Sequence, residues 1–157
     1  MNNRQLLTYT TSLLLAVQMV ASAQPAPKAN PSQTQQPKQL PTLRIPDGVK
    51  AHRDIAYVER GHERHKLDLY VPEKSDGPLP LIIWIHGGGW QNGSKDGCPP
   101  LRQGFTERGY AVASINYRLS GHAVFPAQIE DCKSAIRWLR AHAKQYNLNP
   151  DRFGVWG

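Results

Sequence analysis

Residues 81–85, Leu-Ile-Ile-Trp-Ile, form an apolar run without a polar position. A strand with one face in water alternates apolar and polar residues, so this run predicts a central strand covered on both faces. Strands of this kind occur in sheets that carry helices on both sides. The run ends at His86 and three glycines. Glycine costs conformational entropy on folding, so we infer that another group must approach this backbone closely.

Two strand patterns precede the run and predict an antiparallel hairpin over residues 54–61 and 65–72, with a turn around residues 61–64. In the second strand apolar and polar residues alternate, which predicts one buried face and one face in water: Leu67, Leu69 and Val71 against Lys66, Asp68 and Tyr70. We therefore expect this hairpin at the edge of the sheet.

Helix and strand patterns alternate after the apolar run. We expect a helix over residues 100–108 that Gly109 closes, a buried strand over 110–118, a helix beginning at Pro126 and an apolar strand over 152–157. The helix after Pro126 carries an apolar stripe at spacings of three and four: Ile129, Cys132, Ile136, Leu139 and Ala143. Such alternation requires right-handed crossovers and parallel strands. The predicted fold class is therefore α/β, with an antiparallel hairpin leading into a parallel sheet flanked by helices.

The first 46 residues predict an export signal and a linker. Residues 1–23 contain Arg4 as the only charge, an apolar core too short to span a bilayer and a final Ala-Ser-Ala that suits a signal peptidase. This pattern predicts a signal peptide and a secreted or periplasmic protein. Residues 24–46 are rich in proline and glutamine, which is typical of a linker. The globular part is expected to span residues 47–157.

The charge distribution gives no indication of a nucleic-acid partner. The formal net charge is +7, but much of it lies in the predicted signal and linker. Residues 51–157 hold fourteen basic and eleven acidic side chains, without a basic stripe interleaved with aromatic residues. We expect no nucleic-acid binding, and no membrane span after signal cleavage.

Histidines and cysteines outside the glycine segment have no predicted catalytic role. His62 and His65 form an H-x-x-H pair on the hairpin turn without a third ligand, so no metal site is predicted. His122 is expected to be a solvated side chain. Cys98 and Cys132 are permitted to pair in an exported protein, but Cys132 falls on the apolar stripe of a helix, which favours two unpaired thiols.

The three glycines follow a buried strand at the carboxyl edge of the sheet, where α/β proteins bind ligands. A loop without side chains can present backbone N–H groups, and two converging donors stabilise an oxygen that becomes negative during acyl transfer. A tight turn alone is one alternative. A phosphate-binding loop is another, but the sequence contains no G-x-G-x-x-G or G-K-[ST] pattern.

Residues 86–90, His-Gly-Gly-Gly-Trp, resemble the HGGG-type oxyanion motif of α/β-hydrolase-fold esterases and lipases. Residues 115–119, Ile-Asn-Tyr-Arg-Leu, and the helix over 128–143 are similar to the acetyl- and feruloyl-esterase branch, close to the hormone-sensitive-lipase-like carboxylesterases. The resemblance covers residues 52–157, with the three segments in the family's order.

This resemblance implies a role for each residue of the motif. The amides of Gly88 and Gly89 would form the oxyanion hole, and Trp90 would bind substrate as a wall of the acyl pocket. His86 would be a structural residue that braces the loop. It would not be the catalytic base, because the family's base follows the nucleophile in the chain.

The resemblance also implies that the active site is incomplete within this chain. In the family, the strand at 152–157 leads into the G-x-S-x-G nucleophile elbow, and Gly157 matches the first glycine of that elbow. The nucleophile, the acid and the catalytic histidine would all follow Gly157. We therefore expect a fragment truncated at the elbow, inactive by itself, whose last strand is an aggregation-prone apolar edge.

The implied function is serine-type hydrolysis of short acyl or aryl esters through an acyl-enzyme, with no cofactor and no metal. Acetyl or feruloyl esters are the expected substrates, with esterified plant polysaccharide as a candidate. An amide hydrolase of the same fold, such as an aryl-formamidase or a peptidase, is one alternative. A non-catalytic binding protein of the α/β-hydrolase fold is the other.

Overall fold

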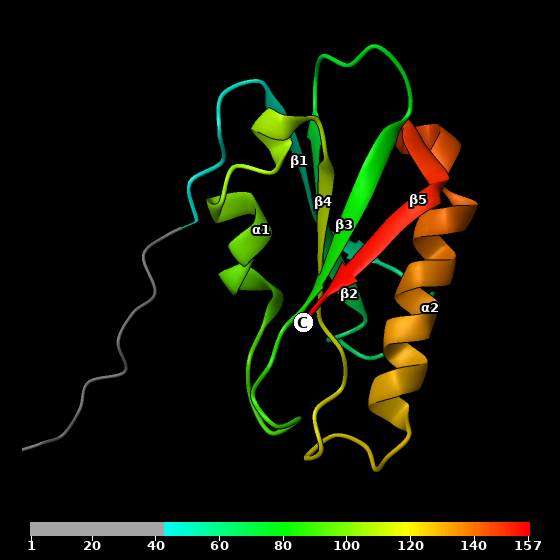
Figure 1. Ribbon diagram of the computed structural model, residues 1–157. Coiled ribbons are helices and arrows are strands. Elements are labelled where there is room, and N and C mark those ends of the chain that lie inside the picture. Colours follow the sequence, from blue (N-terminus) through cyan, green and yellow to red (C-terminus); the bar gives the residue numbers. More distant parts are fainter. Residues whose placement is uncertain (1–42) are drawn as a thin grey trace, which may run out of the picture. The chain divides into compact units, whose positions relative to one another are not determined.

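A mixed sheet of five strands organises the computed structural model, which describes residues 43–157 (Figure 1). The strands lie in the order β1-β2-β4-β3-β5. The predicted signal peptide and most of the predicted linker lie outside the described residues. The strands and helices are β1 (Val49–Ala56), β2 (Lys66–Pro72), β3 (Leu79–Ile85), α1 (Pro99–Arg102), β4 (Ala111–Ile115), α2 (Ala127–Ala141) and β5 (Leu148–Trp156).

The strand directions confirm the predicted hairpin and the parallel sheet. β2 pairs antiparallel with both β1 and β4. β3 pairs parallel with β4 on one side and with β5 on the other, so the apolar run does form a central strand. The carboxyl ends of β3, β4 and β5 therefore share one edge of the sheet. The amino end of β2 lies at the same edge, because β2 runs in the opposite direction.

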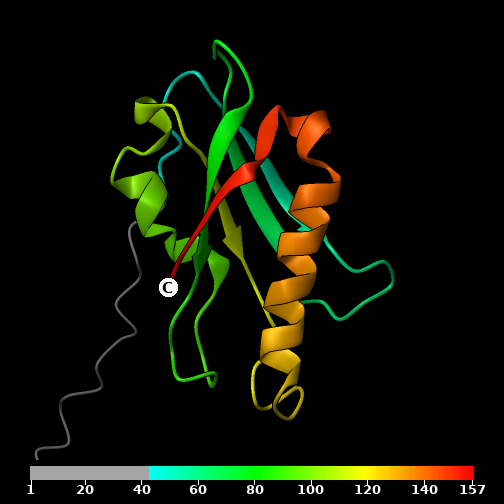
Figure 2. The ribbon, with the colours of Figure 1, turned by 45° about the vertical axis from the view of Figure 1, so that its right-hand side comes forward.

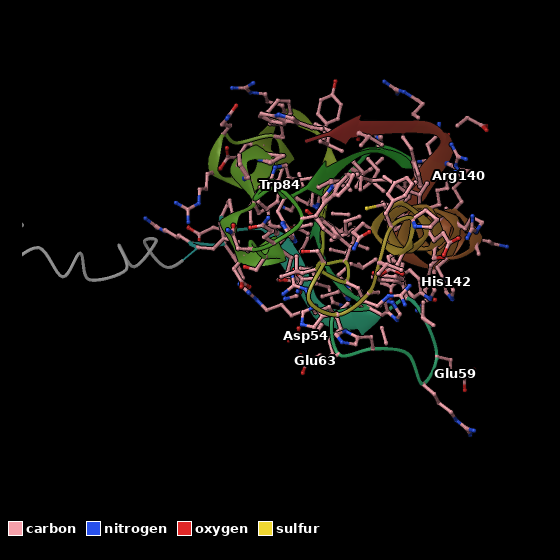
Figure 3. All side chains as sticks on the ribbon, turned by 90° about the horizontal axis from the view of Figure 1, so that it is seen from below. Asp54, Glu59, Glu63, Trp84, Arg140 and His142 are labelled. Carbon is pink, nitrogen blue, oxygen red and sulfur yellow. The ribbon has the colours of Figure 1, made fainter. Side chains whose placement is uncertain are left out.

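α1 and α2 cover opposite faces of the sheet (Figure 2). The larger apolar cluster lies on the α2 face and includes Leu69, Ile83 and Leu139. A smaller cluster lies on the α1 face and includes Tyr70 and Leu101. In the view from below, Trp84 lies on the side of α1 and His142 on the side of α2 (Figure 3).

The prediction that β2 has one face in water is wrong. Asp68 and Tyr70, which the alternation assigned to that face, have no exposed surface. Tyr70 packs in the cluster that contains Leu101 of α1. The Asp68 carboxylate lies 2.8 Å from the Lys95 ammonium group. The segment that follows β3 covers this face, and the local pattern of β2 contains no information about that distant segment.

The continuous helix predicted over residues 100–108 is also wrong. α1 ends at Arg102, and a separate 3₁₀ turn spans Thr106–Arg108. Between them Gly104 has a φ of 71°, in the left-handed region, which an α-helix does not continue through. Gly109 ends the second piece with a φ of 80°, as its predicted capping role requires.

Several boundaries differ from the predicted ones. β1 begins at Val49 rather than at residue 54, and β4 is confined to Ala111–Ile115. β5 begins at Leu148 rather than at residue 152, directly after Asn147, whose left-handed φ of 53° ends the preceding 3₁₀ turn. At the other end, Leu43 and Ile45 of the predicted linker pack against the α1-face cluster.

α2 begins directly after Pro126, as predicted, and buries most of its apolar stripe. Ile129 is 39% exposed near the glycine segment, and Ile136 is partly buried. Ala143 is buried but lies beyond α2, in the 3₁₀ turn Ala143–Tyr146. β5 lies at the edge of the sheet, and Val155 on it is 57% exposed. Among residues 43–157, no helix combines the length and the apolar character needed to cross a bilayer.

Cys98 and Cys132 are both unpaired, which confirms the prediction. Each is buried, in apolar clusters on opposite faces of the sheet. Burial raises the pKa of both thiols to about 11. Both are therefore protonated at neutral pH, and neither has the thiolate character of a reactive cysteine.

Candidate active site

The glycine loop, residues 86–93, follows β3 at the edge where the parallel strands end. A cavity of about 290 Å³ lies against this loop. The sequence singled out five residues for this site. Four of them line the cavity: His86, Gly89, Trp90 and Gly157. Gly88 is the fifth and lies in the same loop without lining the cavity. The structure thus brings the start of the predicted elbow and the glycine motif together.

Three consecutive residues of the glycine loop have positive φ angles. The values are 118° at Gly88, 58° at Gly89 and 62° at Trp90. A Cβ atom at Gly88 would overlap the Asn92 carbonyl oxygen, so the fold requires glycine there. A Cβ atom at Gly89 would meet nothing within 4 Å, so only the left-handed backbone favours glycine at this position.

The amides of Gly88 and Gly89 form no hydrogen bond with any group in residues 43–157. The carbonyl oxygen of Gly88 behaves differently, since it accepts from the Gln91 amide at 3.0 Å and the Asn92 amide at 3.3 Å. Nearly all backbone donors in folded proteins are paired with protein or water. Two neighbouring exposed donors are therefore available to an acceptor on a ligand.

His86 is 3% exposed and is held through both ring nitrogens. Its Nδ1 lies 2.9 Å from the Gly87 carbonyl oxygen, and its Nε2 lies 3.2 Å from a terminal nitrogen of Arg64. A carbonyl oxygen only accepts and a guanidinium only donates, so Nδ1 carries the proton and Nε2 accepts. Burial lowers the pKa of His86. The bond to Gly87 opposes that shift and the Arg64 charge adds to it.

Tyr117, two residues after β4, packs against the same histidine. The two rings stack with centroids 4.3 Å apart and planes 13° apart. The Tyr117 hydroxyl donates to the His86 carbonyl oxygen at 2.7 Å. These are the contacts of a histidine that orients a loop, because they leave neither ring nitrogen free to exchange protons with a substrate. The sequence carried no signal linking the two residues, which follow different strands, β3 and β4.

Trp90 forms an apolar wall together with Phe125. Their rings stack with centroids 5.8 Å apart, and 45% of Trp90 and 64% of Phe125 are exposed. Ile129 lines the same cavity from α2. Sequence reasoning missed Phe125, because a single aromatic residue in a loop before a helix follows no periodic pattern.

A bidentate ion pair joins two of the segments that carry the family resemblance. Arg118, after β4, donates to the Asp131 carboxylate of α2 from Nε at 2.9 Å and from a terminal nitrogen at 2.7 Å. Burial raises the pKa of Asp131, but the Arg118 bonds outweigh it and hold the pKa below its usual value. This pair fixes α2, and with it the α2 side of the cavity, to the end of β4.

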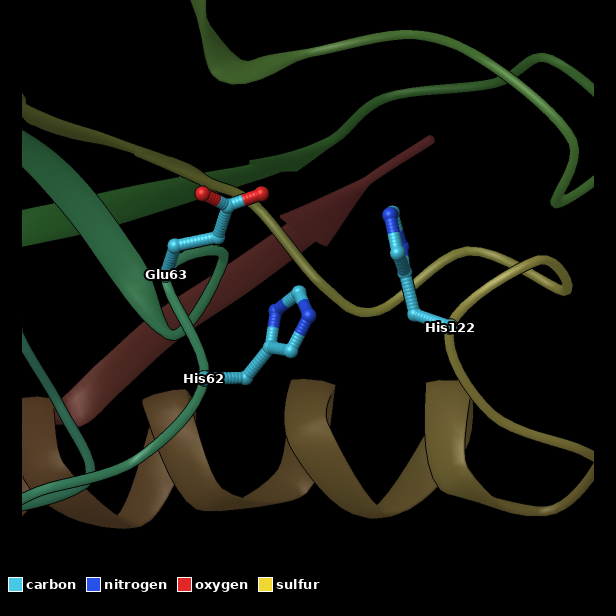
Figure 4. A group of neighbouring side chains, drawn as sticks. All are labelled: His62, Glu63 and His122. Carbon is cyan, nitrogen blue, oxygen red and sulfur yellow. The ribbon is translucent and has the colours of Figure 1, made fainter.

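His62, Glu63 and His122 form a surface cluster whose ligand atoms all lie within 4.8 Å of one another (Figure 4). The sequence paired His62 with His65 and offered no third ligand. The two residues are in contact, since the His62 amide donates to Nδ1 of His65 at 2.9 Å, but His65 is not part of this cluster. His65 turns inward, with its Nε2 3.1 Å from the Asp131 carboxylate. His122 instead approaches His62 from the loop after β4, with ring centroids 4.8 Å apart.

The hydrogen bonds of this cluster do not suit a metal ion. The Nδ1 atoms of His62 and His122 accept from the backbone amides of Arg64 and Leu119, each at 3.1 Å. A neutral ring that accepts at Nδ1 keeps its proton on Nε2. Histidine ligands show the opposite arrangement, with Nδ1–H donating to an acceptor. The cluster would have to break two backbone contacts before Nε2 could bind a metal.

The mixed sheet, with a glycine loop at the carboxyl end of its central strand, defines a chain of the α/β-hydrolase fold. Comparison with known families gives a closer assignment. The chain belongs to the BD-FAE family, which it matches over residues 67–157.

Individual relatives agree with this assignment. The chain is 36% identical over 124 residues to "Probable carboxylic ester hydrolase LipM" of Mycobacterium tuberculosis, covering 77% of this chain and 28% of that protein. A structure described as "Truncated form of carbohydrate esterase from gut microbiota" has a TM-score of 0.62 and 34% identity, covering 68% of this chain and 38% of the other. The structure of esterase B from Lactobacillus rhamnosis has a TM-score of 0.60 and 29% identity, and the match covers 71% of this chain and 36% of that one. The chain thus spans well under half the length of each relative.

Proposed function

We propose that this chain forms the oxyanion-binding part of a serine-type carboxylic ester hydrolase that acts on short acyl or aryl esters. One observation carries the proposal. The adjacent amides of Gly88 and Gly89 have no partner within residues 43–157, and the loop that holds them faces a cavity that Gly157 also lines. The names of the relatives, carboxylic ester hydrolase and esterase, support the same reaction class.

In the proposed mechanism, the serine of an elbow beginning at Gly157 attacks the ester carbonyl carbon. A histidine takes the hydroxyl proton, and the carbonyl oxygen accepts the displaced electron pair. The amides of Gly88 and Gly89 then donate to this oxyanion, and each such donor contributes about 3 kcal/mol to the transition state. The alcohol departs with the proton from the histidine. Water repeats the sequence on the acyl-enzyme and releases the acid.

His86 and Trp90 have separate roles in this proposal. His86 stays neutral and orients the glycine loop, and the base comes from another histidine beyond the elbow. Trp90 and Phe125 contact the acyl or aryl group of the substrate, since both are exposed beside the cavity and their faces are apolar. Acetyl and feruloyl esters fit such a wall. Similarity to a carbohydrate esterase supports esterified polysaccharide as their carrier.

We also propose that the protein is exported. Support comes from the charged start, short apolar core and Ala-Ser-Ala of residues 1–23. Expression in a Gram-negative host followed by N-terminal sequencing tests this, and a mature chain beginning at Gln24 in the periplasm or medium is expected. Retention of Met1 in the cytoplasm would contradict it.

The ester-hydrolase proposal is tested by extending the reading frame and comparing substrates. The extended protein is expected to carry Ser-x-Gly after Gly157 and to hydrolyse p-nitrophenyl acetate faster than N-formylkynurenine. Residues 1–157 alone are expected to be inactive, because they contain no G-x-S-x-G elbow. Faster cleavage of N-formylkynurenine would indicate an amide hydrolase. Another residue in place of the serine, with no turnover of any short ester, would indicate a binding protein.

A further inference from the structure

Arg64 connects three segments at the carboxyl edge of the sheet. Its Nε donates to the Tyr117 carbonyl oxygen at 2.7 Å, and a terminal nitrogen donates to the Gly93 carbonyl oxygen at 2.8 Å. The same nitrogen lies 3.2 Å from Nε2 of His86. Arg64 belongs to the connection between β1 and β2, which reaches this edge because β2 runs antiparallel to β4. One guanidinium therefore contacts both ends of the glycine loop.

The contact with His86 selects one tautomer of its ring. Arg64 has no acceptor atom, so Nε2 of His86 must be the acceptor in their hydrogen bond. The proton of the neutral ring is then on Nδ1, which donates to the Gly87 carbonyl oxygen at 2.9 Å. Tyr117 cannot replace Arg64 in this respect, because its hydroxyl bonds to the His86 carbonyl and not to the ring.

The tautomer in turn determines where one amide of the glycine loop points. The Gly87 carbonyl and the Gly88 N–H belong to the same planar trans peptide, so they point in opposite directions. A bond from His86 that holds the Gly87 oxygen toward the ring therefore holds the Gly88 N–H away from it. The glycines themselves supply no such preference, because a glycine backbone permits many peptide orientations.

We propose that Arg64 is a positioning residue that acts through the His86 tautomer to orient the Gly88 amide for oxyanion binding. This role rests on the ester-hydrolase function proposed above. Lysine is not an equivalent substitute, because a single ammonium cannot reproduce the planar fork that reaches Tyr117 on one side and His86 and Gly93 on the other.

The orientation is tested directly by ¹⁵N NMR of the extended protein, without any assay of activity. Wild-type His86 is expected to carry its proton on Nδ1. Arg64→Met removes the donor, so both tautomers become populated and the Gly88 amide resonance shifts and broadens. Arg64→Lys is expected to retain part of the Nδ1–H population. Arg60→Met is the matched control, since Arg60 is an exposed residue of the same connection and should leave both signals unchanged.

The amide resonances of β4 show whether each variant is folded. If Arg64→Met does not fold, the His86 tautomer and the Gly88 resonance are measured in Arg64→Lys. An unchanged His86 tautomer and an unchanged Gly88 resonance in a folded Arg64 variant would overturn the proposal.

Kinetics then test the catalytic consequence in the extended, active protein. Arg64→Met is expected to lower kcat for p-nitrophenyl acetate by about 10- to 100-fold, below the loss seen when an oxyanion donor is removed outright. KM should change little, because the amide acts in the transition state. An unchanged kcat would overturn the positioning role. If the wild-type protein hydrolyses no ester, the proposed ester-hydrolase function is wrong. The NMR result alone then decides whether Arg64 orients the loop.

Discussion

The two faces of the sheet are covered in different ways. The α2 face is closed by a broad apolar cluster in which Leu69 and Ile83 of the strands pack with Leu139 of the helix. The α1 face has a small apolar cluster around Tyr70 and beside it a buried network of charges centred on Asp68. A long amphipathic helix buries enough apolar area to seal a face by itself. The four-residue α1 does not, and specific polar pairs complete the cover.

The charge network depends on Lys95, which is 6% exposed. Its ammonium group lies 2.8 Å from the Asp68 carboxylate and 3.1 Å from that of Asp54. Burial lowers the pKa of Lys95, but the two carboxylates outweigh that effect and the pKa is raised. The Tyr70 hydroxyl donates to Asp68 at 3.2 Å. This face therefore tolerates the loss of one partner less well than the loss of the whole pair.

The largest expected effect follows from breaking this pair. Lys95→Met leaves Asp68 buried without its principal cation, so the free energy of unfolding should fall by about 3–5 kcal/mol. Replacing both partners, with Lys95→Met and Asp68→Leu together, should recover much of that loss. Urea denaturation of the single and double variants measures the difference, and Lys133→Met on the exposed side of α2 is the control. If the double variant were less stable than Lys95→Met alone, the α1 face would not depend on pairing of these two charges.

The second effect concerns the apolar face. Leu139→Ala removes a side chain with no exposed surface and should lower the free energy of unfolding by about 2–5 kcal/mol, the range for cavity formation in a core. Ile129→Ala is the matched control, because Ile129 lies on the same predicted stripe but is 39% exposed. The fall in the free energy of unfolding should be clearly smaller for Ile129→Ala than for Leu139→Ala. Equal losses at both positions would show that α2 does not seal this face through its buried stripe.

The smallest effect is a pH dependence from the charged pair of the α2 face. The Arg118 guanidinium holds the pKa of Asp131 below its ordinary value in the folded chain, so the ionised carboxylate stabilises the fold above that ordinary pKa. As pH falls through the lowered pKa, this contribution disappears. Asp131→Asn should therefore be less stable than wild type at neutral pH, with a difference that shrinks in acid. Asp151→Asn, at an exposed position, is the control, and a difference that stays constant with pH would contradict the assignment.

Patterns within single elements were sufficient to predict most of the sheet and α2. The apolar run of β3 and the stripe of α2 each reflect the surroundings of one element, so a short window of sequence carries the information. Such local patterns gave a wrong prediction for β2. Its residues do alternate between apolar and polar, but the segment after β3 covers the face that was expected to be in water. Local patterns also failed between residues 100 and 108, where Gly104 adopts a left-handed conformation that helix-forming neighbours do not reveal.

The glycine loop could be located from the sequence, but its supporting residues could not. The three glycines mark a backbone that must come close to another group, and their position after β3 places them at the carboxyl edge. Arg64 lies in the connection between β1 and β2, and Tyr117 and Phe125 lie in the connection between β4 and α2. Tyr117 falls in a segment of the family resemblance, but nothing in the sequence shows that any of the three supports the glycine loop. Their contributions depend on the antiparallel course of β2 and on the loop that precedes α2.

The amino-acid sequence by itself determined the α/β class, the central strand and the position of the bare amides, because periodicity and glycine content act over a few neighbouring residues. Only the tertiary structure decided that Asp68 is buried against Lys95, that His62 meets His122 and that Arg64 holds His86. The physical reason is that such contacts join residues far apart in the chain. They exist only once the sheet order has brought the separate strands to one edge.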